Sequence, residues 1–381
     1  MSQSRKSVPK RRFMEFNNAV AWEQRKLGKE VENVATGRST FFTSIEQSSE
    51  TPYAVLGSTS VISYDKNFDH SGDFILTARV GANAGNLYKY SGDVKISDNT
   101  VYIQAKSLDF VYYLLNKFDL KRLSFGTGQP LVKASELKNL KLMFPNDEEE
   151  QQKIGKFFKY LDDTIALHQR KLEKIKALKT AYLSEMFPAE GETKPKRRFA
   201  GFTDDWEQRK FIEIINRLSK TSNSSILPKV EYEDIIAEEG RLNKDISNKF
   251  DSRKGILFQP NNILYGKLRP YLKNWLYPDF KGVAVGDFWV FEAIEATPRF
   301  IYNLIQSDSY QKAANDTAGT KMPRSDWTKV SNSSFFIPEE SSEQKIIGTF
   351  FKQLDNTIAL HQRKLQKLQN IKKAYLNEMF I

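Results

Sequence analysis

The sequence predicts a mixed α/β (α+β) protein that is built twice, from two divergent bodies and two long helices. The nonamer TIALHQRKL at residues 164–172 recurs without change at 357–365, 193 positions later. Around it, residues 154–187 and 347–380 align without a gap and agree at 24 of 34 positions. Such identity within 381 residues is far beyond chance, so we infer a pseudo-two-fold internal repeat.

The repeat extends beyond the helices. KRRF at residues 10–13 returns at 196–199, and WEQRK at 22–26 returns at 206–210. The Gly-Thr pairs and the prolines that follow keep the offset of 193: Gly126-Thr127 with Gly319-Thr320, Pro130 with Pro323, and Pro145 with Pro338. Little aligns between WEQRK and Gly-Thr. We place the first body at residues 1–150, the first helix at 151–187, the second body at 188–342 and the second helix at 343–381.

Both helices carry a heptad seam with 4-3-4-3 spacing. The seam positions are Ile154, Phe158, Leu161, Ile165, His168 and Leu172 in the first helix and Ile347, Phe351, Leu354, Ile358, His361 and Leu365 in the second. Because the intervening body can fold back, the two helices are expected to pair as an antiparallel coiled coil. A histidine in such a seam usually fixes register and partner choice, and a catalytic histidine pair is the alternative interpretation.

The bodies indicate short strands with small helices packed behind them. Residues 72–79 and 262–269 are β-like runs that each end in arginine, and 283–291 is predicted to be a buried strand pair with a turn. Residues 110–115 and 300–305 are predicted as short helices. The sheets are therefore expected to be mixed and small.

Composition excludes several classes of protein. Cysteine is absent, so neither disulfides nor thiolate chemistry is possible. The N-terminus lacks an apolar signal-peptide core, and no run of 18 apolar residues occurs, so we expect a cytoplasmic protein without a membrane span. Of the net charge of +11, +4 lies on residues 151–187 and +5 on 344–381. These basic helices are either solvated or face a polyanion or an acidic partner.

Catalytic and metal-binding motifs are missing. The chain has three histidines, no His-x-x-x-His, no phosphate-binding P-loop and no signature of an amino-group DNA methyltransferase. Gly126-Thr-Gly128 is read as a loop. Asp119, Glu136 and Lys138 loosely fit a Mg²⁺ nuclease pattern, but Lys329 stands at the second-half position of Glu136. We predict a protein that is not an enzyme and holds no metal, with a stand-alone nuclease as an alternative.

The layout resembles the specificity subunit of Type I restriction–modification enzymes over the whole chain. The resemblance rests on the helix entries EQQKI at 150–154 and EQKII at 343–347, the Gly-Thr loops and the WEQRK segments. It implies that each body is a target recognition domain that reads one half of a split double-stranded DNA sequence, and that the paired helices set the spacer. It also implies two methyltransferase subunits and up to two restriction (translocase) subunits as partners. S-adenosylmethionine, ATP and Mg²⁺ would then be bound by those partners, and this chain would hold no cofactor.

Residues for reading DNA were chosen by their chemistry. Arginine or lysine suits guanine, and asparagine or glutamine suits adenine. In the first body the candidates are Arg79, Asn83, Asn86, Thr127 and Gln129; in the second they are Lys267, Arg269, Lys273, Asn274, Thr320, Lys321 and Arg324. Divergent bodies on matched frameworks imply two different half-sites and hence an asymmetric target.

A protein-interaction scaffold that recruits two partners along a coiled-coil rod is the main alternative, because the two bodies are nearly neutral. A salt-dependent, sequence-specific footprint of the assembled complex on DNA would exclude it. Cleavage by the purified chain with Mg²⁺, lost in Glu136→Ala, would instead support the nuclease.

Helix length gives a first testable prediction. About 35 residues make a rod of roughly 50 Å, which spans on the order of 15 base pairs at about 3.4 Å each. Inserting four residues at matched places in both helices adds about 6 Å, so the non-specific spacer of the DNA target should grow by about two base pairs. The spacer is read from the methylated sequence motif, and an unchanged spacer would contradict the prediction.

Overall fold

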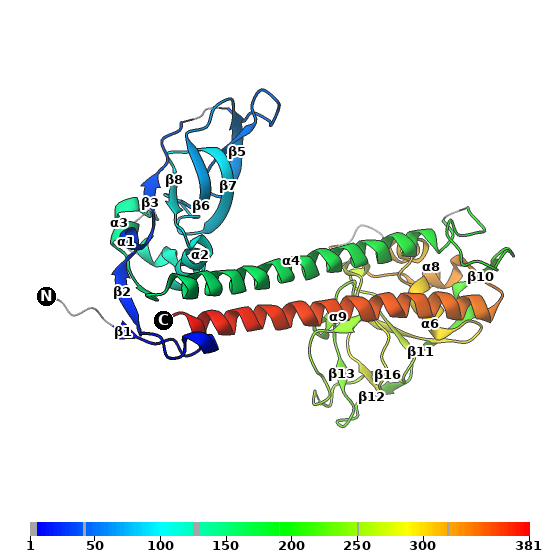
Figure 1. The fold of residues 1–381 in the computed structure, drawn as a ribbon. Helices are drawn as coiled ribbons and strands as arrows, with labels where there is room; N and C mark the ends of the chain where they lie inside the picture. The colour runs from blue at the N-terminus through cyan, green and yellow to red at the C-terminus, as the bar shows by residue number, and fades with distance from the viewer. Residues whose placement is uncertain (1–5, 41–42, 125–129, 190, 250, 318–320) are drawn as a thin grey trace. The chain divides into compact units, whose positions relative to one another are not determined.

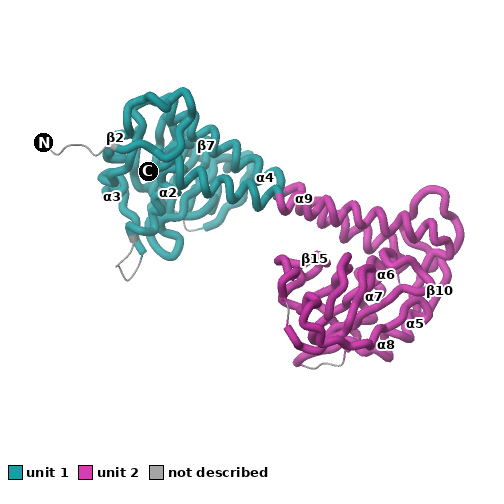
Figure 2. Tube along the Cα trace, turned by 90° about the horizontal axis from the view of Figure 1, so that it is seen from below, with its two compact units in different colours: residues 1–169, 364–381 teal, residues 170–363 magenta. Residues whose placement is uncertain are grey.

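The computed structural model describes residues 6–40, 43–124, 130–189, 191–249, 251–317 and 321–381. The chain forms two compact units, coloured separately in Figure 2. Unit 1 comprises Met1–Gln169 with Lys364–Ile381, and unit 2 comprises Arg170–Arg363. Each unit therefore contains one body and a part of both long helices, α4 (Glu148–Glu185) and α9 (Ser341–Met379). The sequence predicts four consecutive segments, two bodies and two helices. In the structure each helix is divided between the two units.

Unit 1 has a six-stranded and a three-stranded sheet (Figure 1). Its elements before α4 are β1 (Lys6–Ser7), η1 (Met14–Phe16), β2 (Trp22–Lys26), α1 (Leu27–Glu30), β3 (Asn33–Thr36), β4 (Tyr53–Leu56), β5 (Val61–Asp65), β6 (His70–Ala78), β7 (Leu87–Ile96), β8 (Thr100–Gln104), α2 (Leu108–Phe118), η2 (Leu120–Ser124), α3 (Ala134–Asn139) and β9 (Lys141–Phe144). The larger sheet has the order β3-β8-β6-β7-β4-β5, with β4 and β7 parallel, and the smaller one has the order β1-β2-β9.

The second half of strand β6, residues 74–78, is buried on both faces of the large sheet. Ile75 packs in a core cluster with Phe110 of α2 and Phe158 of α4, whereas its neighbours Phe74 and Leu76 belong to a second cluster. This alternation follows from the two-residue period of a strand. Helix α2 therefore lies between the sheet and α4, and the end of β6 is held rigidly.

Unit 2 distributes shorter strands over several small sheets. Its elements are β10 (Glu207–Lys210), α5 (Phe211–Ile214), β11 (Ile215–Leu218), β12 (Thr221–Ser222), β13 (Lys229–Val230), η3 (Tyr232–Asp234), β14 (Ile235–Ile236), β15 (Arg241–Leu242), β16 (Gly255–Phe258), β17 (Ile263–Gly266), η4 (Pro270–Leu272), β18 (Trp275–Leu276), β19 (Gly282–Ala284), β20 (Phe288–Ala293), α6 (Pro298–Leu304), α7 (Asp308–Asn315), α8 (Trp327–Asn332) and β21 (Ser334–Ile337). The sheet orders are β11-β20-β17-β18, β12-β16-β19-β13, β10-β21 and β14-β15.

One four-stranded arrangement occurs in both units. The order β3-β8-β6-β7 of unit 1 corresponds to β11-β20-β17-β18 of unit 2, and each second strand leads into a helix, α2 or α6. The two short helices predicted at 110–115 and 300–305 are thereby confirmed. The predicted strand pair at 283–291 is wrong in its pairing, because β19 and β20 lie in different sheets. Gly286, at φ +103°, turns the chain from one sheet to the other.

The helices pair antiparallel within each unit, as the sequence predicts. In unit 1, Phe157 of α4 packs on Tyr375 of α9 with ring centroids 5.3 Å apart, and Lys372 lies 2.5 Å from Asp162. In unit 2, the residues 193 positions away repeat this pattern. Tyr182 packs on Phe350 at 5.1 Å, and Lys179 lies 2.7 Å from Asp355.

The predicted seam positions are buried or half-buried throughout. Ile154 and Phe158 reach beyond the partner helix into the core of the unit 1 body, and Ile347 and Phe351 do the same in unit 2. His168 and His361 are half-buried, and each interacts with other residues. Lysines 179 and 372, which interrupt the apolar seam, form the two interhelical ion pairs.

The KRRF segments provide the ion pairs at the start of each helix. Arg12 donates two hydrogen bonds of 2.6 Å to Glu150, whose side chain is fully buried, and Trp22 donates a third to the same carboxylate at 3.3 Å. Arg198 binds Glu343 in the same way, at 2.7 and 2.8 Å. Planar guanidinium–carboxylate pairing fixes both direction and distance, so the entry segment is locked to the helix start in each unit.

Adjacent arginines allow a matched test of this pair. Arg12→Met leaves the buried Glu150 carboxylate unpaired and should lower the free energy of unfolding by about 3–5 kcal/mol. Arg11→Met removes an exposed ion pair to Glu378, which solvent screens, and should leave the free energy of unfolding nearly unchanged. Urea unfolding of the purified chain measures both, and equal losses would contradict this prediction.

Candidate nucleic-acid interface

The end of β6 in unit 1 is tied to two other segments by backbone hydrogen bonds. Arg79 N–H donates to the carbonyl of Asn99 at 2.8 Å, and the carbonyl of Arg79 accepts from Val132 N–H at 2.8 Å. Gly81 N–H donates to the carbonyl of Pro130 at 3.0 Å. The loop after β6, the turn before β8 and the segment that follows the Gly-Thr loop therefore meet at one edge.

Unit 2 has the same three bonds at the end of β17. Lys267 N–H donates to the carbonyl of Asp287 at 2.9 Å, Ser325 N–H donates to the carbonyl of Lys267 at 2.8 Å, and Arg269 N–H donates to the carbonyl of Pro323 at 2.7 Å. Lys267 thus occupies the place of Arg79. From the sequence, Arg79 and Arg269 are expected to be counterparts, because each ends an apolar run. In the structure the counterpart of Arg79 is Lys267, two residues before Arg269. We call these equivalent sites the reading edges of units 1 and 2.

The loop of the first reading edge is shaped by glycine and by an asparagine pair. Gly81 and Gly85 have φ values of +89° and +88°, and a Cβ on Gly85 would come within 2.7 Å of the Lys121 backbone nitrogen. Asn86 donates to the side-chain oxygen of the exposed Asn83 at 3.2 Å. The two candidate asparagines therefore order each other, and each retains polar atoms for another partner.

Arg79 is the exposed cation of the first reading edge. Within the described part of the chain, no acidic side chain forms an ion pair with it. Thr127, Gln129 and Thr320, which were also predicted to contact DNA, lie outside the described residues. Lys321 is exposed.

The second reading edge contains a carboxylate between two cations. Asp287 lies 3.0 Å from the Nη2 of Arg324 and 3.7 Å from the Nζ of Lys267. The hydrogen bond from Arg324 to Asp287 raises the pKa of Arg324 above its ordinary value. Arg269 is exposed beside this group and has a left-handed backbone, with φ +48°.

Two further candidates lie in other surroundings. The left-handed residues that flank η4 turn Lys273 toward Glu238, to which it is paired at 3.1 Å, and Asn274 is only 8% exposed. The carbonyl of Asn274 accepts from Gly266 N–H at 2.7 Å. Lys273 and Asn274 are thus the least available of the predicted residues for a ligand at the reading edge.

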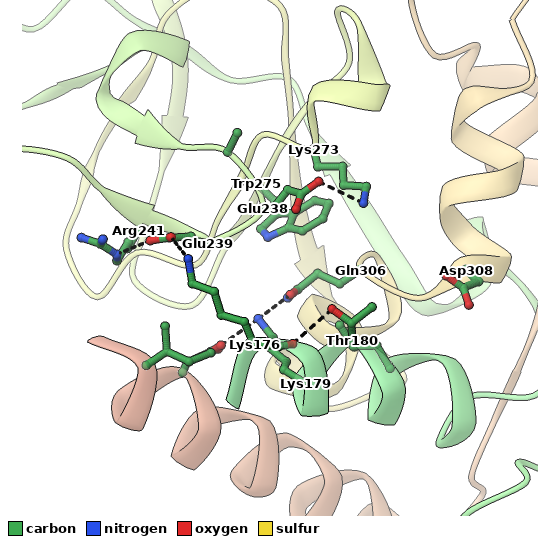
Figure 3. A pocket seen from close by; sticks show the side chains of 14 residues that line it. Lys176, Lys179, Thr180, Glu238, Glu239, Arg241, Lys273, Trp275, Gln306 and Asp308 are labelled. Carbon is green, nitrogen blue, oxygen red and sulfur yellow. Dashed lines mark hydrogen bonds and ion pairs between the residues drawn. The ribbon is translucent and has the colours of Figure 1, made fainter. Parts of the chain in front are cut away.

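Lys273 instead lines a cavity of about 190 Å³ between the body of unit 2 and its helix segments (Figure 3). Several charged groups there are paired: Glu239 accepts from Lys176 at 2.7 Å, and Lys179 lies 2.7 Å from Asp355 and donates to Gln306 at 3.0 Å. Burial opposes ionisation of Glu239, but hydrogen bonds from Lys176 and Gln362 lower its pKa below the ordinary value. The cavity is therefore part of a polar contact between the body of unit 2 and its helix segments.

The loose nuclease constellation has other roles in the structure. Asp119 ends α2 in a left-handed conformation, with φ +61°, and its side chain accepts from Lys121 N–H at 3.3 Å. Glu136 on α3 pairs with Lys133 at 3.5 Å. Among the described residues no group of three or more histidine, aspartate or glutamate side chains could hold a metal ion. In the same part of the chain, no helix has the length and apolarity needed to cross a membrane.

Asn99 and Asp287 are the members of the reading edges that sequence reasoning missed. Each directly precedes a buried strand, β8 or β20, and each accepts the main-chain bond from Arg79 or Lys267. Their position before the strand was the available signal, but only the pairing of β6 with β8 and of β17 with β20 brings them to the edge.

Comparison with known proteins agrees with this duplicated fold. The family model for the Type I restriction modification DNA specificity domain matches residues 19–177 and 203–370. The chain therefore belongs to this family and carries two copies of its domain. A curated relative, the Type I restriction enzyme MjaVIII specificity subunit of Methanocaldococcus jannaschii, is 23% identical over 325 residues, which cover 78% of this chain and 76% of that protein.

Solved structures show the same fold at low sequence identity. The S subunit of a Type I restriction-modification system from M. genitalium superposes with a TM-score of 0.67 at 16% identity, covering 98% of this chain and 99% of that one. A chain from a structure that describes complex assembly and conformational transition of the type I R-M system gives a TM-score of 0.50 at 14% identity, covering 94% and 97%.

Arg79 provides a test of the first reading edge. If Arg79 contacts a base as the sequence predicts, Arg79→Ala should weaken binding to the target DNA by about 1–3 kcal/mol and relax one position of one half-site, because a bidentate contact would be lost. Lys66→Ala removes one positive charge before the opposite end of β6, about 30 Å away at 3.3 Å per residue, and should leave the half-site preference unchanged. Competition binding of the assembled complex to DNA variants measures both, and equal effects would contradict the assignment.

Proposed function

We propose that this chain gives a Type I restriction–modification complex its DNA sequence specificity, with each unit reading one half of a bipartite target. The main support is the pair of reading edges, which share one backbone framework but carry different side chains. Identical frameworks place both edges in the same relation to their own helix segments, and different side chains read different bases. The target is therefore asymmetric.

The chemistry of the edges suits direct readout in the major groove. Arginine and lysine bind the O6 and N7 of guanine, and asparagine binds the N6 and N7 of adenine. Unit 1 presents Arg79 with Asn83 and Asn86, and unit 2 presents Lys267, Arg269 and Arg324. The glycines of the first loop allow close approach of the backbone to phosphates, which would position the duplex without reading it.

The two helices are proposed to set the spacer between half-sites and to dock two methyltransferase subunits. Most of the excess positive charge lies on these helices, and the bodies are nearly neutral. We therefore expect the isolated chain to bind DNA weakly and to gain affinity when methyltransferase subunits close around the duplex. Up to two restriction subunits would complete the enzyme.

The chain itself is proposed to be non-catalytic and to act within the cytoplasm. Asp119 accepts a hydrogen bond from Lys121 N–H and Glu136 pairs with Lys133, and the described residues of the reading edges are cations, amides and one carboxylate. S-adenosylmethionine, ATP and Mg²⁺ are assigned to the partner subunits, which carry out methyl transfer, translocation and cleavage.

The test is a genome-wide map of methylated adenine in cells with and without the gene. We expect one split motif with a fixed spacer to lose methylation on deletion, because specificity is supplied by this chain alone. Affinity capture of the chain should also recover a methyltransferase. Identical maps in cells where the methyltransferase is co-purified and active would overturn the proposal.

A further inference from the structure

The two reading edges differ at the position before the second strand of each four-stranded arrangement. Asn99 and Asp287 are equivalent, because each carbonyl accepts the main-chain bond from the residue that follows β6 or β17. Leu131 and Arg324 are equivalent as well, since they form the matching isolated bridges to Val80 and Leu268. Unit 1 therefore combines an arginine with an amide, whereas unit 2 combines a lysine and an arginine with a carboxylate.

The carboxylate of Asp287 binds one edge of the Arg324 guanidinium. Its carboxylate oxygens lie 3.4 Å from Nε and 3.0 Å from Nη2 of Arg324, and Lys267 lies on the same carboxylate at 3.7 Å. The side chain of Arg324 is 52% exposed and that of Asp287 29% exposed. Asp287 thus fixes the side of the guanidinium that carries Nε and Nη2, while the remaining N–H donors of Arg324 stay open to a ligand.

The main chain that carries Asp287 is fixed by its surroundings. Its carbonyl accepts from Lys267 N–H at 2.9 Å and from the hydroxyl of Tyr232, whose ring packs on Phe288 with centroids 4.6 Å apart. The same hydroxyl accepts from Leu268 N–H at 3.2 Å. These contacts fix the backbone of the turn that carries Asp287, and so they limit where its carboxylate can lie.

A carboxylate at a DNA-reading edge opposes binding to a polyanion, because it cancels part of the positive potential. Non-specific affinity for DNA comes from that potential. A carboxylate that restrains two cations reduces non-specific attraction and lowers the entropy cost of placing the guanidinium on a base. Both effects favour discrimination between bases over affinity.

We propose that Asp287 is a specificity-determining positioning residue of the second half-site, which orients Arg324 toward a guanine edge, and that Asn99 occupies the corresponding position for the first half-site. This inference rests on the proposed function and assigns its chemistry to particular residues. In unit 1 the neutral amide leaves Arg79 without an acidic restraint among the described residues, so the two edges differ in rigidity as well as in side chains.

The test uses the full complex with its methyltransferase in cells whose own copy of the gene is deleted. Asp287→Asn and Arg324→Ala are each compared with wild type by mapping methylated adenine. We expect both variants to lose discrimination at the same base position of one half-site, by about tenfold or more, while the other half-site and the spacer stay unchanged. A purely structural role would not direct both effects to one base.

Asp251→Asn is the matched control. Asp251 pairs with Arg253 at 2.6 Å in the same unit, and their exposures of 30% and 49% are close to those of Asp287 and Arg324. Asp251→Asn removes the same charge as Asp287→Asn, but from an ion pair outside the reading edge. The motif methylated by the complex with Asp251→Asn should therefore equal that of wild type.

Three results would overturn the inference. They are an unchanged motif in both Asp287→Asn and Arg324→Ala, effects of the two variants on different base positions, and an equal change in Asp251→Asn.

If Asp287→Asn does not accumulate as a folded complex, Asn99→Asp is the deciding variant. It places a carboxylate on the exposed turn beside Arg79 and should alter the first half-site alone, and an unaltered first half-site would reject the proposal. Absence of any split motif with the wild-type chain would instead reject the proposed function.

Discussion

The fold depends on an exchange of helix ends between the two repeats. In unit 1 the core is closed by Phe380, which directly follows α9 and packs against Trp22, Phe110 and Phe158 at 5.5–6.3 Å between ring centroids. In unit 2, Phe187, which follows α4, occupies the same place. Burying one such side chain contributes about 1.5–3 kcal/mol. Neither body can complete its core with its own helix alone, and so antiparallel pairing is a requirement of both bodies.

The helices could be predicted from the sequence because their signal is local and strongly periodic. The nonamer, the heptad spacing and the upstream prolines each specify the same helix, and two copies in one chain imply pairing. The heptad period could not show that Ile154 and Phe158 also enter the core of the unit 1 body. An apolar residue at a seam position gives the same sequence pattern whether it packs against a helix or a sheet. The role of Arg12 was also hidden, because its partner Glu150 is 138 residues away.

The reading edges were predicted only in part for a related reason. Residue type and position located Arg79 and Lys267, which follow apolar runs, and Arg324, which follows the second Gly-Thr pair. Register is set by backbone hydrogen bonds, which residue type does not reveal, and the left-handed residues around η4 carry Lys273 away from the expected place. Asp287 comes from a neighbouring strand, so its place at the edge depends on pairing across the sheet.

The exchange of helix ends also sets the order in which the specificity subunit can finish folding during synthesis. Domains generally fold as units, N-terminal first, as the chain emerges. Here unit 2 is one continuous stretch, Arg170–Arg363, whereas unit 1 needs Lys364–Ile381 as well as its own first 169 residues. The body that is synthesised first is therefore completed last, because its core also includes Met379 and Phe380. A chain that stops directly after Arg363 would therefore contain the whole of unit 2 but only part of unit 1.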